Sequence, residues 1–167
     1  MTTIDHLLFA LKLFSALGSG LIAGVFFAFS TFVMNALARL QPTQGIIAMQ
    51  TINMTVINPW FMIAFLGTAA TCVLLAISSL WQGNQPGTAY LLLGSLLYLM
   101  GTVLVTIVFN VPLNDALAIV KPDSPEGASL WSGYLANWTL WNHVRTAAAL
   151  VAATAFTFAL CAQSARS

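Results

Sequence analysis

Charged side chains are scarce in this sequence. Only nine of its 167 residues are Lys, Arg, Asp or Glu, whereas about a quarter of the residues of a soluble domain are charged. None lies between Arg39 and Asp115, and that stretch can hold two helical crossings of about 20 residues each. The net charge of +1 gives no basic patch for nucleic acid. The composition therefore indicates a polytopic membrane protein whose main partner is the lipid bilayer.

Clusters of metal-binding or haem-binding side chains are also missing. Cys72 and Cys161 lie alone in apolar runs without a CxxC motif, so we interpret them as packing residues. His6 and His143 are expected on opposite sides of the membrane, which excludes a bis-histidine haem. The sequence also has no phosphate-binding loop or nucleophile elbow. We therefore expect no metal site and no bound cofactor.

Four long apolar runs are present. They lie at about 7–34, 60–81, 88–109 and 138–162, and the second and third are joined by the short polar linker "QGNQPG". Backbone polar groups inside hydrocarbon must be satisfied within their own segment, so each run is expected to form a helix. The first run is too long for a signal peptide. The sequence predicts an all-α fold, a single domain over residues 1–167 that forms an antiparallel four-helix membrane bundle.

The number of runs also predicts which connections lie together. Four crossings place both termini and the 82–87 linker on one side, with the connections 39–59 and 115–137 on the other. The distribution of Lys and Arg between the sides is nearly even, and we expect cytoplasmic termini. "GIIAMQTINMTVINP" carries no charge, and it predicts a short extra helix in the 39–59 connection that covers one end of the bundle.

Two glycines at GxxxG spacing, Gly20 and Gly24, lie in the first run. Small residues at this spacing let helix backbones approach closely in membranes. Packing within the bundle is the favoured interpretation, and a homodimer is the alternative.

A polar and aromatic stripe marks the start of the fourth run. On a helical wheel one third of the circumference holds Trp131, Tyr134, Trp138, Trp141, Asn142 and Arg145. His143 falls on the opposite side of that wheel. An ionisable residue within a crossing usually faces the protein interior and marks function. The stripe therefore predicts a functional surface that contains Arg145.

Further amides are expected at the same end of the bundle. The third run carries Thr102, Thr106 and Asn110 at helical spacing, followed by a predicted kink at Pro112 and then by Asn114. The 39–59 connection adds Gln50, Asn53 and Asn58. Topology brings these residues to the end that holds the stripe, which predicts a polar pocket with aromatic walls for a hydrophobic small molecule. Two alternatives stay open: Arg145 as an anchor that reaches the headgroups, and a purely structural polar cluster.

Four segments in order, "GLIAGVFFAFSTFVMNAL", "MQTINMTVINPWFM", "FNVPLNDALA" and "WTLWNHVRTAAALVA", resemble a bacterial membrane family that includes the fungal anthrone oxygenases. The resemblance covers nearly the whole chain. It implies a protein of the bacterial cytoplasmic membrane that converts an anthrone-like polycyclic phenol to its quinone with dioxygen and without a cofactor.

The resemblance also suggests roles for the polar residues. Arg145 and Asn142 suit an enolate oxygen, and His143 is the nearby side chain suited to act as a general base. The expected substrate-binding residues are Asn53, Asn58, Asn110, Asn114, Tyr134, Trp138 and Trp141. A protein that binds a quinone, isoprenoid or lipid without turnover, and a structural membrane subunit, are the alternative functions.

Overall fold

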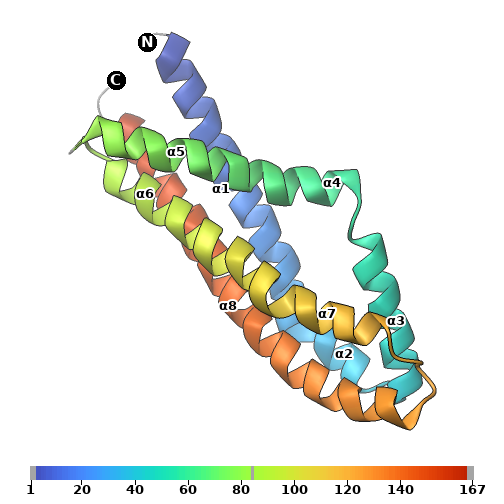
Figure 1. Cartoon of the computed structure of the whole chain (residues 1–167). Helices are drawn as coiled ribbons and strands as arrows, with labels where there is room; N and C mark the ends of the chain where they lie inside the picture. Colours follow the sequence, from blue (N-terminus) through green and yellow to red (C-terminus); the bar gives the residue numbers. More distant parts are fainter. Residues whose placement is uncertain (1–2, 84, 165–167) are drawn as a thin grey trace.

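The computed structural model describes residues 3–83 and 85–164 and is 90% helical (Figure 1). Four helical stretches are long and apolar enough to cross a membrane: Thr3–Ala38, Pro59–Trp81, Thr88–Ala118 and Pro125–Ala162. The predicted all-α fold is confirmed, with four stretches long and apolar enough to span a membrane. The four apolar helices fit a multi-pass membrane protein.

Three of the four crossings alternate between α-helix and wider π-helical turns. The first comprises α1 (Thr3–Ala28), η1 (Phe29–Val33) and α2 (Met34–Ala38). The second comprises α4 (Pro59–Met62), η2 (Ile63–Gly67) and α5 (Thr68–Gln82). The third comprises α6 (Thr88–Leu96), η3 (Leu97–Leu104), η4 (Thr106–Asn110) and α7 (Val111–Ala118). The fourth is one helix of 40 residues, α8 (Pro125–Ser164).

The fourth helix begins well before the predicted start at residue 138. Pro125 stands in its first turn, where a missing N–H costs nothing, and the Ser124 hydroxyl accepts a hydrogen bond from the Gly127 N–H at 3.0 Å. Glu126 adds a negative charge at the positive end of the helix dipole. The polar segment before residue 138 is therefore helical, and the stripe continues through unbroken α-helix.

The third crossing also extends beyond its predicted end at residue 109. Pro112 lies in the first turn of α7, directly after the π-helical segment η4. A proline cannot donate the hydrogen bond that an α-helix needs at that position. The chain meets this constraint with π-helical turns before the proline, and the helix continues to Ala118.

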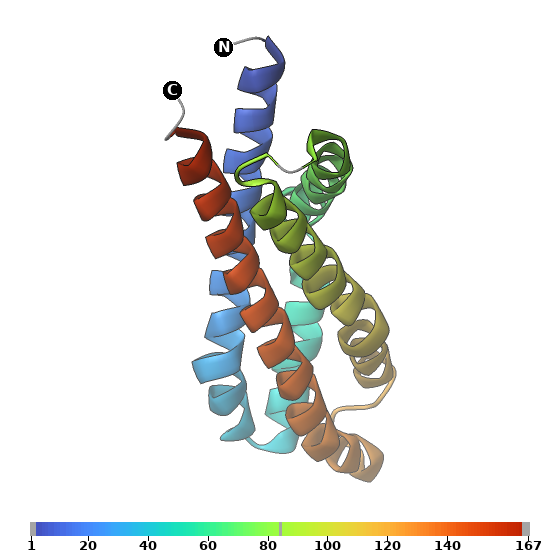
Figure 2. The same cartoon turned by 90° about the vertical axis from the view of Figure 1, so that its left-hand side faces the viewer.

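The crossings pack in a ring in chain order. Helix α8 contacts both α1 and α6, and α5 contacts the same two helices from the other side. Figure 2 shows α8 running beside α1 on one side and the third crossing on the other. Both termini and the α5–α6 connection lie at one end of the molecule, and the two longer connections lie at the other (Figure 1). In the short connection Gly83 and Gly87 adopt positive φ angles of 59° and 89°, which glycine tolerates.

The predicted extra helix is present as α3 (Pro42–Thr55) and closes the long-loop end. The Gln50 side-chain nitrogen donates to the carbonyls of Leu117 and Val120 at 2.9 and 3.2 Å, which satisfies the C-terminal end of α7. Gly45 lies against the Trp131 ring, where an added Cβ would come within 2.7 Å of a ring carbon. Helix α3 is thus tied to both the third and the fourth crossing.

The outer surface is apolar along the crossings. Trp60 and Trp81 stand at the two ends of the second crossing and are 83% and 85% exposed. Twenty-one residues of helix separate them by about 32 Å, close to the hydrocarbon thickness of a bilayer. The two rings therefore have the exposure and spacing expected of interfacial anchors.

The face of α1 that carries Gly20 and Gly24 is open. A Cβ added at either glycine would meet no atom within 4 Å. The favoured interpretation of the GxxxG spacing, close packing within the bundle, is wrong, because no neighbouring helix approaches the Cβ position of either glycine.

Candidate functional site

Arg145 lies inside the bundle and is 4% exposed. Its Nη1 donates to the Thr106 hydroxyl at 3.1 Å, and its Nη2 donates to the side-chain oxygen Oδ1 of Asn142 at 2.7 Å. The guanidinium carbon stands 4.1 Å from the centre of the Phe26 ring and 5.1 Å from that of Trp138. Such positions over aromatic faces stabilise a cation. The prediction that Arg145 faces the bundle agrees with this geometry.

Among the described residues, no carboxylate is hydrogen-bonded to Arg145. Its two hydrogen-bond partners in the described part of the chain are a hydroxyl and an amide, both neutral. Its Nε–H has no hydrogen-bond partner among the described residues. A buried cation without an opposite charge is costly in a low-dielectric interior. The arrangement therefore favours a negatively charged or strongly polar oxygen as an additional partner.

Asn142 holds Arg145 in place. Its Nδ2 donates to the Phe26 carbonyl at 2.7 Å and to the Ser30 hydroxyl at 2.8 Å, so both amide atoms are engaged. The Thr146 hydroxyl bonds both the Asn142 carbonyl, at 2.8 Å, and Ser30, at 3.1 Å. The network connects α8 to the first crossing where η1 begins, and it fixes the direction of the guanidinium group.

A second network positions the aromatic rings. Asn114 Oδ1 accepts one hydrogen bond from the Tyr134 hydroxyl at 2.9 Å and another from Trp138 Nε1 at 2.8 Å. The rings of Trp131, Tyr134 and Trp138 stack in sequence, with centroid separations of 5.5 and 6.3 Å. Buried Tyr and Trp usually satisfy their polar atoms in this way. Asn114 therefore fixes two aromatic side chains of α8.

A cavity of about 320 Å³ contacts both networks, through Arg145 of the first and through Asn114 and Trp138 of the second. Ligand pockets range from about 300 to 1,000 Å³, so this volume suits a small molecule. Four of its lining residues are polar: Asn53, Thr106, Asn114 and Arg145. The other walls are aliphatic or aromatic, and they include Phe26, Phe29, Met49, Phe61, Phe65, Leu66, Val103, Ile107, Val111 and Trp138.

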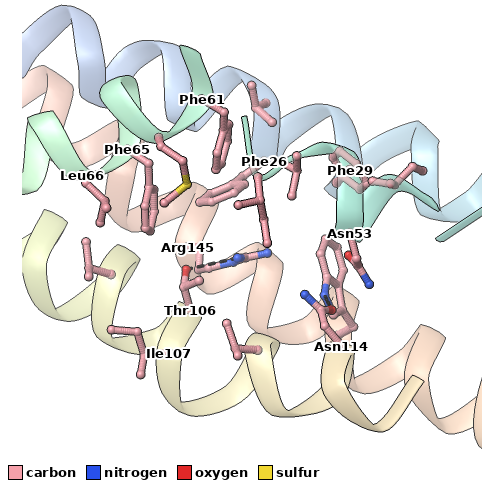
Figure 3. Close-up of a pocket in the computed structure, with 18 of the residues that line it drawn as sticks. Phe26, Phe29, Asn53, Phe61, Phe65, Leu66, Thr106, Ile107, Asn114 and Arg145 are labelled. Atoms are coloured by element: carbon pink, nitrogen blue, oxygen red, sulfur yellow. Dashed lines mark hydrogen bonds between the residues drawn. The ribbon is translucent and has the colours of Figure 1, made fainter. Parts of the chain in front are cut away.

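The cavity has a polar end and an apolar end. Figure 3 shows Asn53 and Asn114 side by side at one end, with Phe61, Phe65 and Leu66 at the other. The Arg145 side chain reaches into the space between these groups (Figure 3). The arrangement fits a molecule whose polar atoms lie at one end of a hydrophobic skeleton.

Each π-helical segment contributes to this cavity. Phe29 comes from η1, Phe65 from η2, Val103 from η3, and Thr106 and Ile107 from η4. In η1 the Met34 N–H donates to the Phe29 carbonyl, a step of five residues. π-helical turns often occur at functional sites because they redirect side chains locally.

The predicted site residues fall into three groups. Asn53, Asn114, Trp138 and Arg145 line the cavity. Asn142 and Tyr134 lie directly behind it and bond to Arg145 and Asn114. The remaining four, Asn58, Asn110, Trp141 and His143, do not line it.

These four residues make other contacts. Asn58 caps α4, accepting the Phe61 N–H at 3.1 Å. Asn110 donates to the Trp138 carbonyl at 3.1 Å, and Trp141 stacks on Phe109 with a centroid separation of 3.5 Å. His143 is exposed and lines a separate open groove of about 480 Å³ with residues of α2 and α8 such as Met34, Asn35 and Thr139. The structure does not bring the predicted general base to the cavity.

Sequence reasoning missed the phenylalanines and Met49 of the cavity wall. Phe26, Phe29, Phe61 and Phe65 come from two crossings, and a phenylalanine within a crossing suits lipid as well as a cavity. Thr106 carried a signal, because it belongs to the spaced ladder Thr102, Thr106 and Asn110. The described residues contain no group of three or more His, Cys, Asp or Glu side chains that could hold a metal ion.

The fold and the site together define a class: a four-crossing helical membrane protein with a buried arginine in an aromatic cavity. A family model described as anthrone oxygenase matches residues 60–155, more than half of the chain. The chain therefore belongs to the anthrone oxygenase family. The match includes Arg145, Asn114 and Thr106, whereas Phe26, Phe29 and Asn53 lie outside it. No curated protein and no solved structure matches the chain significantly.

Proposed function

We propose that this protein is a membrane oxygenase that uses dioxygen to convert an anthrone-like phenolic ketone to the corresponding quinone. The observation that carries the proposal is Arg145, a buried cation with neutral partners on the wall of an aromatic cavity. Membership of the anthrone oxygenase family supports the same class of substrate.

Arg145 suits an oxyanion that forms during the reaction. An anthrone loses a proton from its ring CH₂ group and becomes an enolate whose negative charge lies on oxygen. A pre-positioned donor in a dry site stabilises such a charge far more than water-exposed donors do. Arg145 therefore makes the bound ketone a stronger acid, and Asn142 acts as its positioning residue by holding Nη2 at 2.7 Å.

The enolate then reacts with dioxygen without an external reductant. It gives up electrons to O₂, a C–O bond forms at the former CH₂ carbon, and the resulting peroxide anion takes up the proton first lost from that carbon to become a hydroperoxide. Loss of the second C–H proton with cleavage of the O–O bond leaves a ketone and releases water. One oxygen atom enters the product and the other leaves as water, so electrons and atoms balance.

The first proton needs an acceptor outside the wall of the cavity. The lining residues include no His, Asp, Glu, Lys or Cys in the described part of the chain, and His143 lies in the separate groove. We propose that water accepts the proton. Arg145 favours this transfer because it stabilises the enolate that remains. The flat rings are held by Phe26, Phe29 and Trp138, which suit stacking on a fused-ring ligand.

Oxygen consumption tests this proposal. Purified full-length protein in lipid nanodiscs should consume one dioxygen per anthrone and place one ¹⁸O atom from ¹⁸O₂ in the product ketone. Heat-denatured protein provides the background rate, and the same assay with a chelator tests for adventitious metal. Equal rates in active and denatured samples would refute the oxygenase proposal, and ligand binding without turnover would then favour a lipophile-binding protein.

Residence in a bacterial cytoplasmic membrane with cytoplasmic termini remains part of the proposal. Reporter fusions after residue 85 and at the C-terminus should report the cytoplasm, and a fusion near residue 124 should report the opposite side.

A homodimer through Gly20 and Gly24 also stays a prediction, since both glycines face open space. Cross-linking in native membranes measures it.

A further inference from the structure

We propose that the cavity receives its ligand sideways from the bilayer, through a slot between the second and third crossings. The proposal rests on the proposed function only in taking the cavity as a ligand site. Four cavity-lining residues are also strongly exposed on the outer surface: Ile57 at 72%, Ile107 at 59%, Leu66 at 49% and Val111 at 40%. They are the points where the cavity wall meets the outside.

These four residues lie on the two opposite edges of one opening. Leu66 belongs to η2, and Ile57 to the turn before α4, on the side of the second crossing. Ile107 belongs to η4, and Val111 begins α7, on the side of the third crossing. The two crossings contact each other along α5 and α6 near the short linker, and they diverge toward the long-loop end (Figure 1). The cavity lies in the space between them.

The depth of the slot places it in hydrocarbon. Leu66 is six residues beyond Trp60, which is about 9 Å along the helix from the end marked by that ring. All four rim side chains are aliphatic; Leu66, Ile107 and Val111 belong to segments apolar enough to span the membrane, and Ile57 lies at the interfacial end of the slot, two residues before Pro59. The slot therefore opens toward acyl chains, and its rim excludes water.

The rim and the interior together define the class of ligand. An apolar slot admits a molecule that is dissolved in the bilayer. Beyond it, Arg145 reaches into the middle of the cavity, and Asn53 and Asn114 lie at the polar end. The ligand is thus a flat lipophile with an acidic or anionic oxygen at its leading end. Its hydrocarbon skeleton trails toward Phe65 and Leu66.

Binding kinetics test the slot with a defined probe, the fluorescent flat anion 9-anthracenecarboxylate, on full-length protein in nanodiscs. Leu66→Trp and Ile107→Trp add bulk to the rim. Leu74→Trp and Leu104→Trp are matched controls, since both leucines are exposed on the same two crossings but do not line the cavity. In each rim variant association should slow about fivefold or more, and dissociation should slow as well, because one opening serves both directions.

Whether the probe dissociates more slowly or faster distinguishes a narrowed slot from a damaged binding site. A rim variant that damaged the binding site would release the probe faster, and that outcome, or kinetics equal to those of the controls, would overturn the slot. Failure of the wild-type protein to bind the probe would overturn the cavity as an anion site and the slot with it. Unchanged kinetics beside normal turnover of anthrone would overturn the slot alone and leave the proposed function standing.

Discussion

Two hollows lie on different faces of α8, and they contain residues only two positions apart. The cavity of about 320 Å³ holds Arg145, which is 4% exposed and bonded on both Nη atoms. The groove of about 480 Å³ holds His143, which is exposed. Two helical steps rotate a side chain by about 200°. The comparison shows that enclosure and supporting bonds, rather than the presence of a titratable side chain, distinguish a candidate site.

Of the substitutions considered, Arg145→Leu should have the largest effect on ligand binding in the cavity. It removes the cation, so affinity for 9-anthracenecarboxylate should fall about 100-fold, as expected for a charge-assisted hydrogen bond. Binding of uncharged anthracene should change far less. Fluorescence titration in nanodiscs measures both, with Arg39→Leu as the control because Arg39 is exposed. Equal losses for the two probes would mean that the substitution disrupts the fold rather than an anion site.

Asn142→Ala should weaken ligand binding in the cavity less than Arg145→Leu does. It frees Nη2 of Arg145 and leaves a buried guanidinium N–H without its partner, at about 1–3 kcal/mol. Affinity for the carboxylate probe should fall about tenfold, and thermal stability in detergent should fall with it. Retention of wild-type affinity would show that Thr106 and the aromatic rings position Arg145 without Asn142.

Tyr134→Phe should have a smaller effect, mainly on stability. It removes one of the two hydrogen bonds to Asn114 and keeps the ring stack, so the free energy of unfolding should fall by about 0.5–1.5 kcal/mol. Tyr90→Phe is the matched control, because Tyr90 is 44% exposed. Chemical denaturation in detergent measures the difference, and equal values for the two variants would contradict a role for this bond.

His143→Ala should have the smallest effect. His143 lies outside the cavity, so probe affinity and the rate of anthrone oxidation should both stay within about twofold of wild type. Parallel binding and oxygen-uptake assays check this expectation. A large loss of turnover with normal binding would restore His143 as the general base and would require α8 to rotate or bend during the reaction.

Much of the fold was predictable because charge is so rare in this sequence. The four crossings and helix α3 follow from apolar length, and the inward direction of Arg145 follows from its place in the stripe with Asn142 and Trp138. The start of α8 was misplaced because the 125–137 segment looks like a polar loop. Its helix signals, Ser124 as a cap followed by Pro125, are local and short.

The cavity itself was only partly predictable. Asn58 and Asn114 have the same chemistry, yet one caps a helix and the other holds two aromatic rings. That difference depends on how the crossings pack, which a single sequence does not encode locally. The π-helical turns leave no clear period in the sequence, although they carry Phe65 and Thr106 to the cavity wall.

The aliphatic rim formed by Leu66 and Ile107 also has a consequence for the second reactant and for the product. Dioxygen is apolar and dissolves more readily in hydrocarbon than in water, so the proposed slot would draw both reactants of the proposed oxygenation from the phase that is richer in them. The quinone formed has no acidic ring hydrogen and cannot become an enolate. In the proposed reaction the product therefore loses the ionic attraction to Arg145 and keeps only hydrogen bonds to its neutral carbonyl oxygens, which would favour its return to the lipid through the proposed slot.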